Sequence, residues 1–497
     1  MRVLLLDPPR LRSPRDVDLV VESPLSAALL TGYAAASLRA AGFPVTVLAA
    51  DLEQLTPEQV RERVGREAPD LLAVHLRYQW DRTGEVLELL RRLKADLPEA
   101  HLTAYGHFPT FSARELLAAH PVLDSAVLGE PEDTLRELGR TLEAAGDWRG
   151  LPGLAVRRGG AVEWAARPPR ADLDGLPFPE RADPALVEAR GIHTYVLGSR
   201  GCFGHCSFCY VGSFPGPGSP WRGRSPAAVV REMELLRHRR GSDHFYFADA
   251  NFCGPGPAGR RRGRELAALL RARLPGIRFG IETRAPDLDE TLVRELVAGG
   301  LESVFLGLES GSPRLLARFG KGFGEPEQRR AVQLLREQGV RLCAGFIMFA
   351  PDSRLEDVTQ SFRLLERLEL LDDPVTTAHL LFHREVVLRG TADYRRLAEE
   401  GRLEPASFLG YEGRYRIADP QVERLSRAVG ELARRVLAAA GLGEGGAAGG
   451  EAVSRVLREA FRECLDRLAR DGPGARVEAV LEDAWCAARR FFEEVGS

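Results

Sequence analysis

Short apolar runs alternate with amphipathic stretches through the first 147 residues. The apolar runs cover residues 3–6, 45–48, 71–76, 102–105 and 125–128, and helical spacing is found near residues 24–41, 57–67, 82–96, 111–119 and 132–145. Alternation of short buried strands with helices is typical of a parallel, doubly wound α/β sheet. We therefore expect a Rossmann-type domain over residues 1–147, with any ligand outside the carboxyl ends of its strands.

The alternation resumes after a stretch rich in turn signals. Residues 148–190 contain Pro and Gly clusters around one expected hairpin, and we interpret them as a linker. Beyond it, strands are expected near residues 192–197, 244–248, 277–282, 303–308, 341–348 and 379–388, with helices near 225–239, 260–273, 288–299, 325–338 and 354–370. Six β/α units of this length predict a partial (β/α)6 barrel over residues 191–400, with functional groups at the carboxyl ends of its strands.

The last hundred residues have helical spacing. Apolar residues recur at helical intervals over residues 420–440 and 451–496, and the glycine-rich residues 441–450 between them predict a flexible link. We expect residues 401–497 to form a helical region that caps the barrel.

Composition and charge exclude several classes of protein. The net charge of −3 disfavours a dedicated nucleic-acid binder, and no run of 18 apolar residues predicts a membrane span. The first residues do not have the pattern of a signal peptide. Seven cysteines, with three of them clustered, suit a reducing compartment, so we expect a cytoplasmic protein.

Three cysteines fall within eight residues of one glycine-rich loop. Cys202, Cys206 and Cys209 have the spacing C-x₃-C-x₂-C, and glycines at 198, 201 and 204 allow tight bends. A zinc site would need a fourth ligand, and His205 is interpreted as a bystander. An iron–sulfur cube has four corners, so three local thiolates would leave one iron open. A zinc loop, or a non-enzymatic metal-binding interaction protein, is the alternative.

This loop, with the aromatic Phe208 before its last cysteine, resembles the radical S-adenosylmethionine (SAM) enzymes. The resemblance implies a 4Fe-4S cluster on the three cysteines, whose open iron chelates SAM. One electron, from a reductant such as flavodoxin or ferredoxin, would cleave SAM to a 5′-deoxyadenosyl radical that abstracts hydrogen from a substrate. It also implies that the segment with Asp249 and Asn251 lies at the SAM amino group.

Two further segments are candidates for contact with SAM. Gly307-Leu308-Glu309-Ser310 matches the stretch that lies near the ribose and methionyl part of SAM in this family, which implicates Glu309 and Ser310. Arg284 follows a predicted strand, and its guanidinium has a geometry suited to a carboxylate.

The N-terminal half resembles the cobalamin-binding domain that precedes the radical SAM domain in one large subfamily. The resemblance rests on residues 105–110 and on Leu128-Gly129-Glu130-Pro131-Glu132. However, no D-x-H-x-x-G motif is present, and Tyr105 and residues 76–80 (LRYQW) are bulky where a corrin ring needs close backbone approach. We therefore expect an empty domain, with bound cobalamin as the alternative.

Two outcomes are open for the substrate radical. The resemblance implies either cobalamin-dependent C-methylation or, without cobalamin, dehydration of a 1,2-diol, as in an aminoglycoside precursor. Dehydration needs an acid and a base, and we expect it, with Tyr210, Asp249, His383 and Glu385 as catalytic candidates. On the predicted strand 379–388, His379, His383 and Glu385 would share one face.

Overall fold

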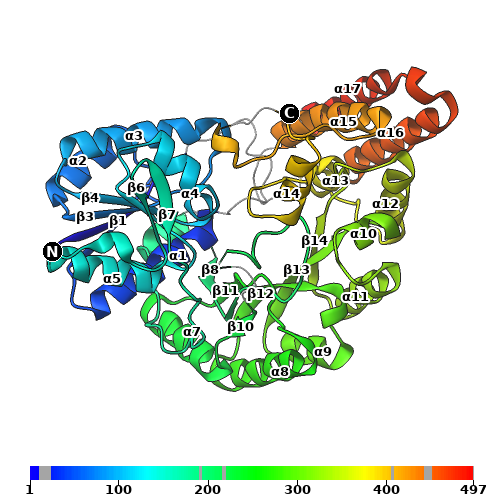
Figure 1. Ribbon diagram of the computed structural model, residues 1–497. Coiled ribbons are helices and arrows are strands. Elements are labelled where there is room, and N and C mark those ends of the chain that lie inside the picture. Colours follow the sequence, from blue (N-terminus) through cyan, green and yellow to red (C-terminus); the bar gives the residue numbers. More distant parts are fainter. Residues whose placement is uncertain are drawn as a thin grey trace.

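We describe the chain from a computed structural model, which covers residues 1–10, 24–189, 193–214, 216, 220–404, 408–440 and 450–495. The molecule has two α/β lobes and a bundle of helices near its carboxyl end (Figure 1). The predicted α/β fold class is confirmed. The glycine-rich link expected at residues 441–450 lies, except for Gly450, outside the described residues.

The first lobe is built on a seven-stranded sheet of order β2-β1-β3-β4-β5-β6-β7. Its parallel strands are β1 (Val3–Asp7), β2 (Val45–Ala49), β3 (Leu71–His75), β4 (His101–Tyr105) and β5 (Ser125–Val127), and its antiparallel hairpin is β6 (Leu154–Arg158) and β7 (Ala161–Trp164). The helices are α1 (Pro24–Ala40), α2 (Pro57–Glu67), α3 (Thr83–Asp96), α4 (His107–Ala119) and α5 (Pro131–Glu143). The hairpin expected in the linker thus extends this sheet.

Local sequence explains these elements. Every residue of β1, β3 and β4 is buried, as expected for parallel strands covered on both faces. Helix α2 begins at a capping box, in which the Thr56 hydroxyl accepts from Gln59 N–H and the Gln59 side chain accepts from Thr56 N–H. The boundaries predicted from hydrophobic spacing, residues 57–67 and 82–96, agree closely with those of α2 and α3 in the structure.

The second lobe is a parallel sheet of order β14-β13-β12-β11-β8. The strands are β8 (Thr194–Val196), β11 (His244–Phe247), β12 (Arg278–Arg284), β13 (Leu301–Glu309) and β14 (Arg341–Phe346). Helices α7 (Pro226–Arg240), α8 (Gly256–Arg273), α9 (Glu290–Ala298) and α11 (Glu325–Glu337) lie along its outer face (Figure 1). Phe245, Phe279, Val304 and Leu306 point outward into the core beneath these helices.

The sixth barrel strand predicted at residues 379–388 is wrong. Helix α12 (Leu355–Arg367) is followed by α13 (Pro374–Phe382), and His383 caps α13. Asp373 and Pro374 begin this helix, since the Asp373 carboxylate accepts from Thr376 N–H and Pro is favoured in a first turn. His379 and Glu385 therefore do not share a strand face, and among the described residues only the bridge between Phe349 and Arg384 continues the sheet there.

Besides the short helices α6 (Pro184–Ala189) and α10 (Pro313–Arg318), the described residues contain four helices toward the carboxyl end. Helix α14 (Ala392–Glu399) lies near the cysteine loop. Helices α15 (Pro420–Ala440) and α16 (Gly450–Asp471) pack on α12 and α13, and α17 (Val477–Val495) packs on α15 and α16. The helical region predicted at the carboxyl end is thus present. None of the helices in the described ranges has both the length and the apolar character needed to cross a membrane.

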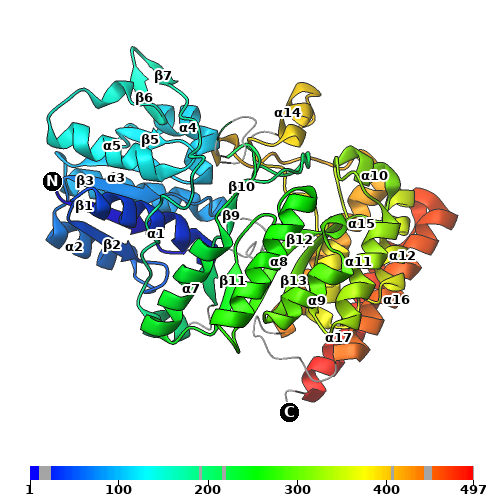
Figure 2. The same cartoon turned by 90° about the horizontal axis from the view of Figure 1, so that it is seen from below.

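A short antiparallel pair joins the lobes. β9 (Ser199–Arg200) and β10 (Arg222–Gly223) flank the cysteine loop and lie between the lobes (Figure 2). From this pair Arg200 binds Glu132 at 2.6 Å, and Arg222 binds Glu130 at 2.6 Å. All four side chains are less than a tenth exposed. These two ion pairs therefore connect the start of α5 to the strands that flank the cysteine loop.

Candidate functional site

Two thiols of the cysteine loop lie beside Gly204. A side chain at Gly204 would meet the Cys202 Sγ at 3.5 Å, the Cys206 Sγ at 3.8 Å and an Arg284 nitrogen at 4.0 Å. Gly201 has φ +75°, and a Cβ there would lie 2.8 Å from the Pro220 carbonyl oxygen. Glycine is therefore required by backbone conformation at 201 and leaves the thiol side of the loop open at 204.

The surroundings of Cys206 and Cys209 disfavour their thiolate forms unless a cation is bound. Burial raises the pKa of Cys206, and it raises the pKa of Cys209 to about 12. A metal cation that replaces the proton removes this penalty. Within the described parts of the chain, no three His, Cys, Asp or Glu side chains are placed as ligands of a single metal ion. A cube presents its irons at separate corners, so its thiolates need not converge on one point.

A buried cation and carboxylate face this loop. Lys321 Nζ lies 2.9 Å from Glu309 Oε1, and Lys321 is only 3% exposed. Burial opposes the Lys321 charge, but Glu309 and the thiol of Cys206 outweigh it and raise the pKa of Lys321. Lys321, in the segment Phe319-Gly320-Lys321-Gly322, was not among the predicted site residues, although a lysine between two glycines is the signal that could have found it.

Glu309 ends β13 in a strained conformation. Its φ of +67° is uncommon for a residue with a side chain, and strain of this kind clusters at binding sites. A Cβ at Gly307 would lie 2.6 Å from Glu309 Oε1, so this glycine leaves space for the carboxylate. Ser310 is fully buried and its hydroxyl pairs with that of Ser361 at 3.0 Å. The structure thus places the predicted Glu309 beside the cysteine loop, while Ser310 holds the strand end.

Arg284 fits a ligand carboxylate. Its guanidinium lies over the rings of Phe203 and Phe323 and donates to the Lys321 carbonyl at 3.0 Å. Its buried Nε has no hydrogen-bond partner among the described residues. Phe208 packs edge-on against Phe319. A free donor, a strained Glu309 and three thiols on one loop are the features that a 4Fe-4S cluster and its chelated SAM need, so the residues present fit both groups.

Asp249 and Asn251 are turned inward. The Asp249 carboxylate accepts from Gly198 N–H at 2.7 Å and from the Ser199 hydroxyl at 2.8 Å, and burial raises its pKa to about 6. Asn251 donates to Asp287 and accepts from Gly254 N–H. Both side chains are fully buried, so they shape the entry to the cysteine loop. Their predicted contacts with SAM and with substrate stay predictions.

The other catalytic candidates are not brought together. Glu385 is buried against Arg318 at 3.0 Å, and His383 ends α13, where burial lowers its pKa to about 4. Tyr210 instead faces the first lobe, with its ring 4.7 Å from that of His107. A single acid–base group built from these residues is therefore not present in this structure, and their individual roles stay predictions.

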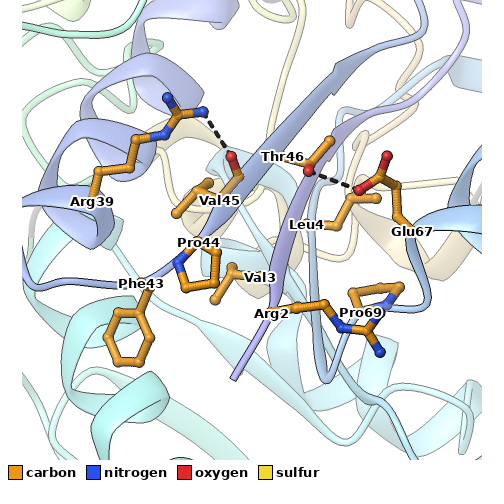
Figure 3. A pocket seen from close by; sticks show the side chains of 10 residues that line it. All are labelled: Arg2, Val3, Leu4, Arg39, Phe43, Pro44, Val45, Thr46, Glu67 and Pro69. Carbon is orange, nitrogen blue, oxygen red and sulfur yellow. Dashed lines mark hydrogen bonds between the residues drawn. The ribbon is translucent and has the colours of Figure 1, made fainter.

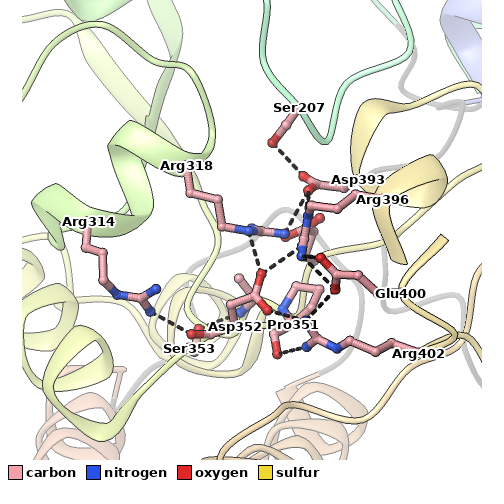
Figure 4. Close-up of polar contacts among 12 residues, drawn as sticks. Ser207, Arg314, Arg318, Pro351, Asp352, Ser353, Asp393, Arg396, Glu400 and Arg402 are labelled. Atoms are coloured by element: carbon pink, nitrogen blue, oxygen red, sulfur yellow. Dashed lines mark hydrogen bonds and ion pairs between the residues drawn. The ribbon is translucent and has the colours of Figure 1, made fainter. Parts of the chain in front are cut away.

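A polar network anchors the cysteine loop from the side of α14 (Figure 4). The Ser207 hydroxyl donates to Asp393 at 2.5 Å, and Asp393 N–H donates to the Ser207 carbonyl at 3.0 Å. Arg318 binds Asp393 at 2.9 Å and Asp352 at 2.8 Å. Sequence analysis missed Asp393 and Arg318 because they lie far along the chain from the residues they support.

The edge of the first lobe that would hold a ligand is filled. At the ends of β1, β3 and β4, the Thr31 hydroxyl bonds to Asp7 and to the Tyr105 hydroxyl, and His75 bonds to Asp7. Beside them lies an aromatic cluster of fully or nearly fully buried rings, Tyr78, Trp80, Phe108 and Tyr411. Tyr411 comes from beyond the second lobe. At the described part of this edge, the polar groups and the aromatic rings thus contact one another.

A hollow of about 400 Å³ lies elsewhere on the first lobe (Figure 3). Its lining includes Val3, Phe43, Val45 and Glu67, which lie near the amino ends of β1 and β2. Ligands of doubly wound sheets bind at the opposite, carboxyl ends of the strands. This hollow therefore does not lie at the edge of the first sheet where a ligand is expected.

Comparison with known proteins assigns both lobes. Residues 196–365 match the radical SAM superfamily, and residues 26–139 match the B12 binding domain. The anaerobic magnesium-protoporphyrin IX monomethyl ester cyclase of Synechocystis is 27% identical over 409 residues, which are 80% of this chain and 79% of that protein. An uncharacterized methyltransferase of Pyrococcus horikoshii is 25% identical over 376 residues, which are 74% of this chain and 79% of that protein.

Solved structures share the fold. The cobalamin-dependent SAM radical enzyme OxsB, with aqua-cobalamin and SAM bound, superposes with a TM-score of 0.79 at 18% identity and covers all of this chain and 80% of its own. The radical SAM methyltransferase TsrM of Kitasatospora setae gives a TM-score of 0.62 at 22% identity over 74% of each chain. The expectation of an empty first lobe has no support among these proteins. The chain is therefore an enzyme that carries a domain of the radical SAM superfamily, preceded by a domain of the B12-binding type.

Proposed function

We propose that the chain abstracts a hydrogen atom from a small organic molecule and that this leads to methylation, with cobalamin as a further cofactor. The observation that carries hydrogen abstraction is the cysteine loop itself, in which the thiols of Cys202 and Cys206 lie beside Gly204 and Arg284, and Cys206 interacts with the Glu309–Lys321 pair. Support for methylation comes from relatives: besides the methyltransferase above, the hopanoid C-3 methylase of Methylococcus capsulatus is 27% identical over 382 residues.

The chain's own residues prepare the site. Cys202, Cys206 and Cys209 would hold the cluster, and the buried Lys321 balances thiolate charge. The free Nε of Arg284 would receive the carboxylate of SAM. When bound, the cluster and SAM together supply the 5′-deoxyadenosyl radical. The reductant stays a prediction, and dithionite can replace it in the assay.

The first experiment tests the cluster. After anaerobic reconstitution, the wild type should contain about four irons per chain and form 5′-deoxyadenosine from SAM and dithionite. Cys202→Ala, Cys206→Ala and Cys209→Ala should each lose both properties. Cys486→Ala, a change at an exposed cysteine of α17, is the matched control and should keep them. Full activity in any of the first three variants would refute the assignment.

A second candidate function is dehydration of a diol without cobalamin. The specific observation in its favour is the filled ligand edge of the first lobe, with the aromatic cluster of Tyr78, Trp80, Phe108 and Tyr411. Relatives do not support this outcome, and an aminoglycoside precursor as substrate stays a prediction.

One preparation separates the two functions. Methyl transfer from SAM leaves S-adenosylhomocysteine, whereas hydrogen abstraction leaves 5′-deoxyadenosine. The chain is reconstituted with hydroxocobalamin, desalted, and examined by visible spectroscopy and by product analysis. Stoichiometric corrin together with S-adenosylhomocysteine supports methylation. Absence of corrin with 5′-deoxyadenosine as the sole SAM product favours the second candidate.

A further inference from the structure

The inner face of the second sheet carries polar and aromatic groups that the proposed function does not use. Side chains alternate along a strand, so with Phe245, Phe279 and Val304 in the outer core, the residues between them face inward. The register aligns Tyr246 with Tyr195 and Gly280, and it aligns Glu282 with Phe305 and Phe305 with Cys343.

Phe305 is exposed in the middle of a central strand. It is 41% exposed, although β13 lies between β12 and β14. A Cβ at Gly345 would lie 2.8 Å from the Phe305 ring, so the ring covers this glycine on the neighbouring strand. An exposed large apolar side chain on the inner face of a barrel sheet indicates a surface that a ligand covers.

Glu282 lies beside this ring without a cation. Its carboxylate accepts from the Tyr246 hydroxyl at 3.3 Å. Over the described ranges, no Lys or Arg forms an ion pair with it, and burial raises its pKa to about 7. A Cβ at Gly280 would lie 2.7 Å from the Tyr246 ring, and the Tyr195 ring is 5.5 Å from that ring. A recessed carboxylate bordered by aromatic rings thus lacks a positive partner.

The distance to the cluster loop suits a substrate. Glu282 precedes Arg284 by two residues on β12, so their backbones are about 7 Å apart along the same face. Arg284 in turn reaches the thiol side of Gly204. A molecule bound at Glu282 would therefore lie next to the predicted SAM site, farther along β12 toward the interior of the barrel.

We propose that Glu282, Tyr246 and Phe305 form the binding site for an organic ammonium group of the substrate. The carboxylate would pair with the ammonium, and the neighbouring ring faces would attract it through cation–π contact. This inference rests on the proposed function, because it makes the inner face the substrate side of the site.

Cys343 provides a local probe of this surface. It is exposed and lies opposite Phe305 on β14. Cys486 is also exposed, lies on α17 and serves as the internal reference. The reconstituted full chain is alkylated with iodoacetamide, with and without benzylamine, tryptamine or spermidine, and each cysteine is followed by peptide mass spectrometry. Benzyl alcohol is the neutral control.

At least one amine should slow alkylation of Cys343 several-fold without slowing that of Cys486, and benzyl alcohol should not. Glu282→Gln should weaken this protection about tenfold in amine concentration, a loss of about 1.4 kcal/mol, and Tyr246→Phe should weaken it less. Glu302→Gln, at the amino end of β13, should keep it. Equal protection in wild type and Glu282→Gln, or no protection by any amine, would overturn the inference.

The proposed function is tested separately, by measuring 5′-deoxyadenosine formation with the same preparation. A chain that forms 5′-deoxyadenosine but shows no protection of Cys343 overturns only the ammonium site. Protection of Cys343 in a chain that forms no 5′-deoxyadenosine refutes the proposed function and leaves the site as a binding surface.

Discussion

At the scale of single residues, buried carboxylates differ according to their partners. Glu309 forms an ion pair with Lys321, and Asp249 accepts hydrogen bonds from two donors. Glu385 forms an ion pair with Arg318, which also binds two other acids. Glu385 Oε1 has no hydrogen-bond partner in the described part of the chain. Asp249 and Glu309 were expected to follow strands and Glu385 to lie on a predicted strand, but the partner of each is decided by tertiary contact.

Glu385 should make stability depend on pH. Burial raises its pKa from 4.5 to about 8, so the folded protein binds the proton more tightly than the unfolded chain does. The stability from this group is full below about pH 4.5 and is lost as pH rises through 8. Between about pH 6 and 9, the wild type should lose about 2.7 kcal/mol of unfolding free energy relative to Glu385→Gln, because 1 pKa unit corresponds to about 1.4 kcal/mol. Urea unfolding measures this.

Glu99→Gln, at an exposed turn before β4, is the control and should follow the wild type at every pH, because no ion pair holds this carboxylate within the described residues. A constant difference between wild type and Glu385→Gln across this range would contradict the prediction.

At the scale of elements, the cysteine loop depends on segments far from it in sequence. The loop bonds to α14 through Ser207 and Asp393, and Gly320 approaches the His205 carbonyl, where a Cβ would lie at 2.9 Å. The spacing of the cysteines predicted the loop itself, because the three thiols are local. Its supports were not predictable, because nothing near the loop in sequence marks Asp393.

Asp393→Ala should loosen the cluster. The change removes the acceptor of the Ser207 hydroxyl and one partner of Arg318, a loss of about 1 kcal/mol per hydrogen bond. Iron should therefore leave the reconstituted chain about fivefold faster in excess chelator, measured by absorbance of the iron complex. Asp372→Ala, at an exposed position before α13, is the matched control. Equal rates for all three proteins would show that α14 does not support the loop.

At the scale of the whole molecule, the two lobes meet through buried charge and packed rings. Arg200 and Arg222 bind the start of α5, and Tyr411 packs against Tyr78 and Phe108 of the first lobe. The first lobe therefore forms part of the support of the cysteine loop, whether or not it holds cobalamin.

Glu132→Ala should weaken this junction. Arg200 is 9% exposed and would lose its 2.6 Å partner, keeping only the more distant Glu130 at 3.4 Å. Breaking a buried ion pair costs about 3–5 kcal/mol. Urea unfolding should report a loss near the lower end of that range, and limited proteolysis between the lobes should accelerate. The exposed Glu99→Ala should change neither. An equally small effect of Glu132→Ala would refute this role.

The sequence by itself determined the three cluster cysteines, the alternation of strands and helices in both lobes and the glycine-rich end of β13. These depend on spacing within a few residues, where side-chain periodicity and backbone freedom act directly. Only the tertiary structure decided that residues 374–382 form a helix rather than a sixth strand, that Asp249 turns inward, and that Glu282 lies beside Tyr246 and Phe305 without a cation. These outcomes depend on which strands become neighbours and on which charges are buried together, and local spacing does not contain that information.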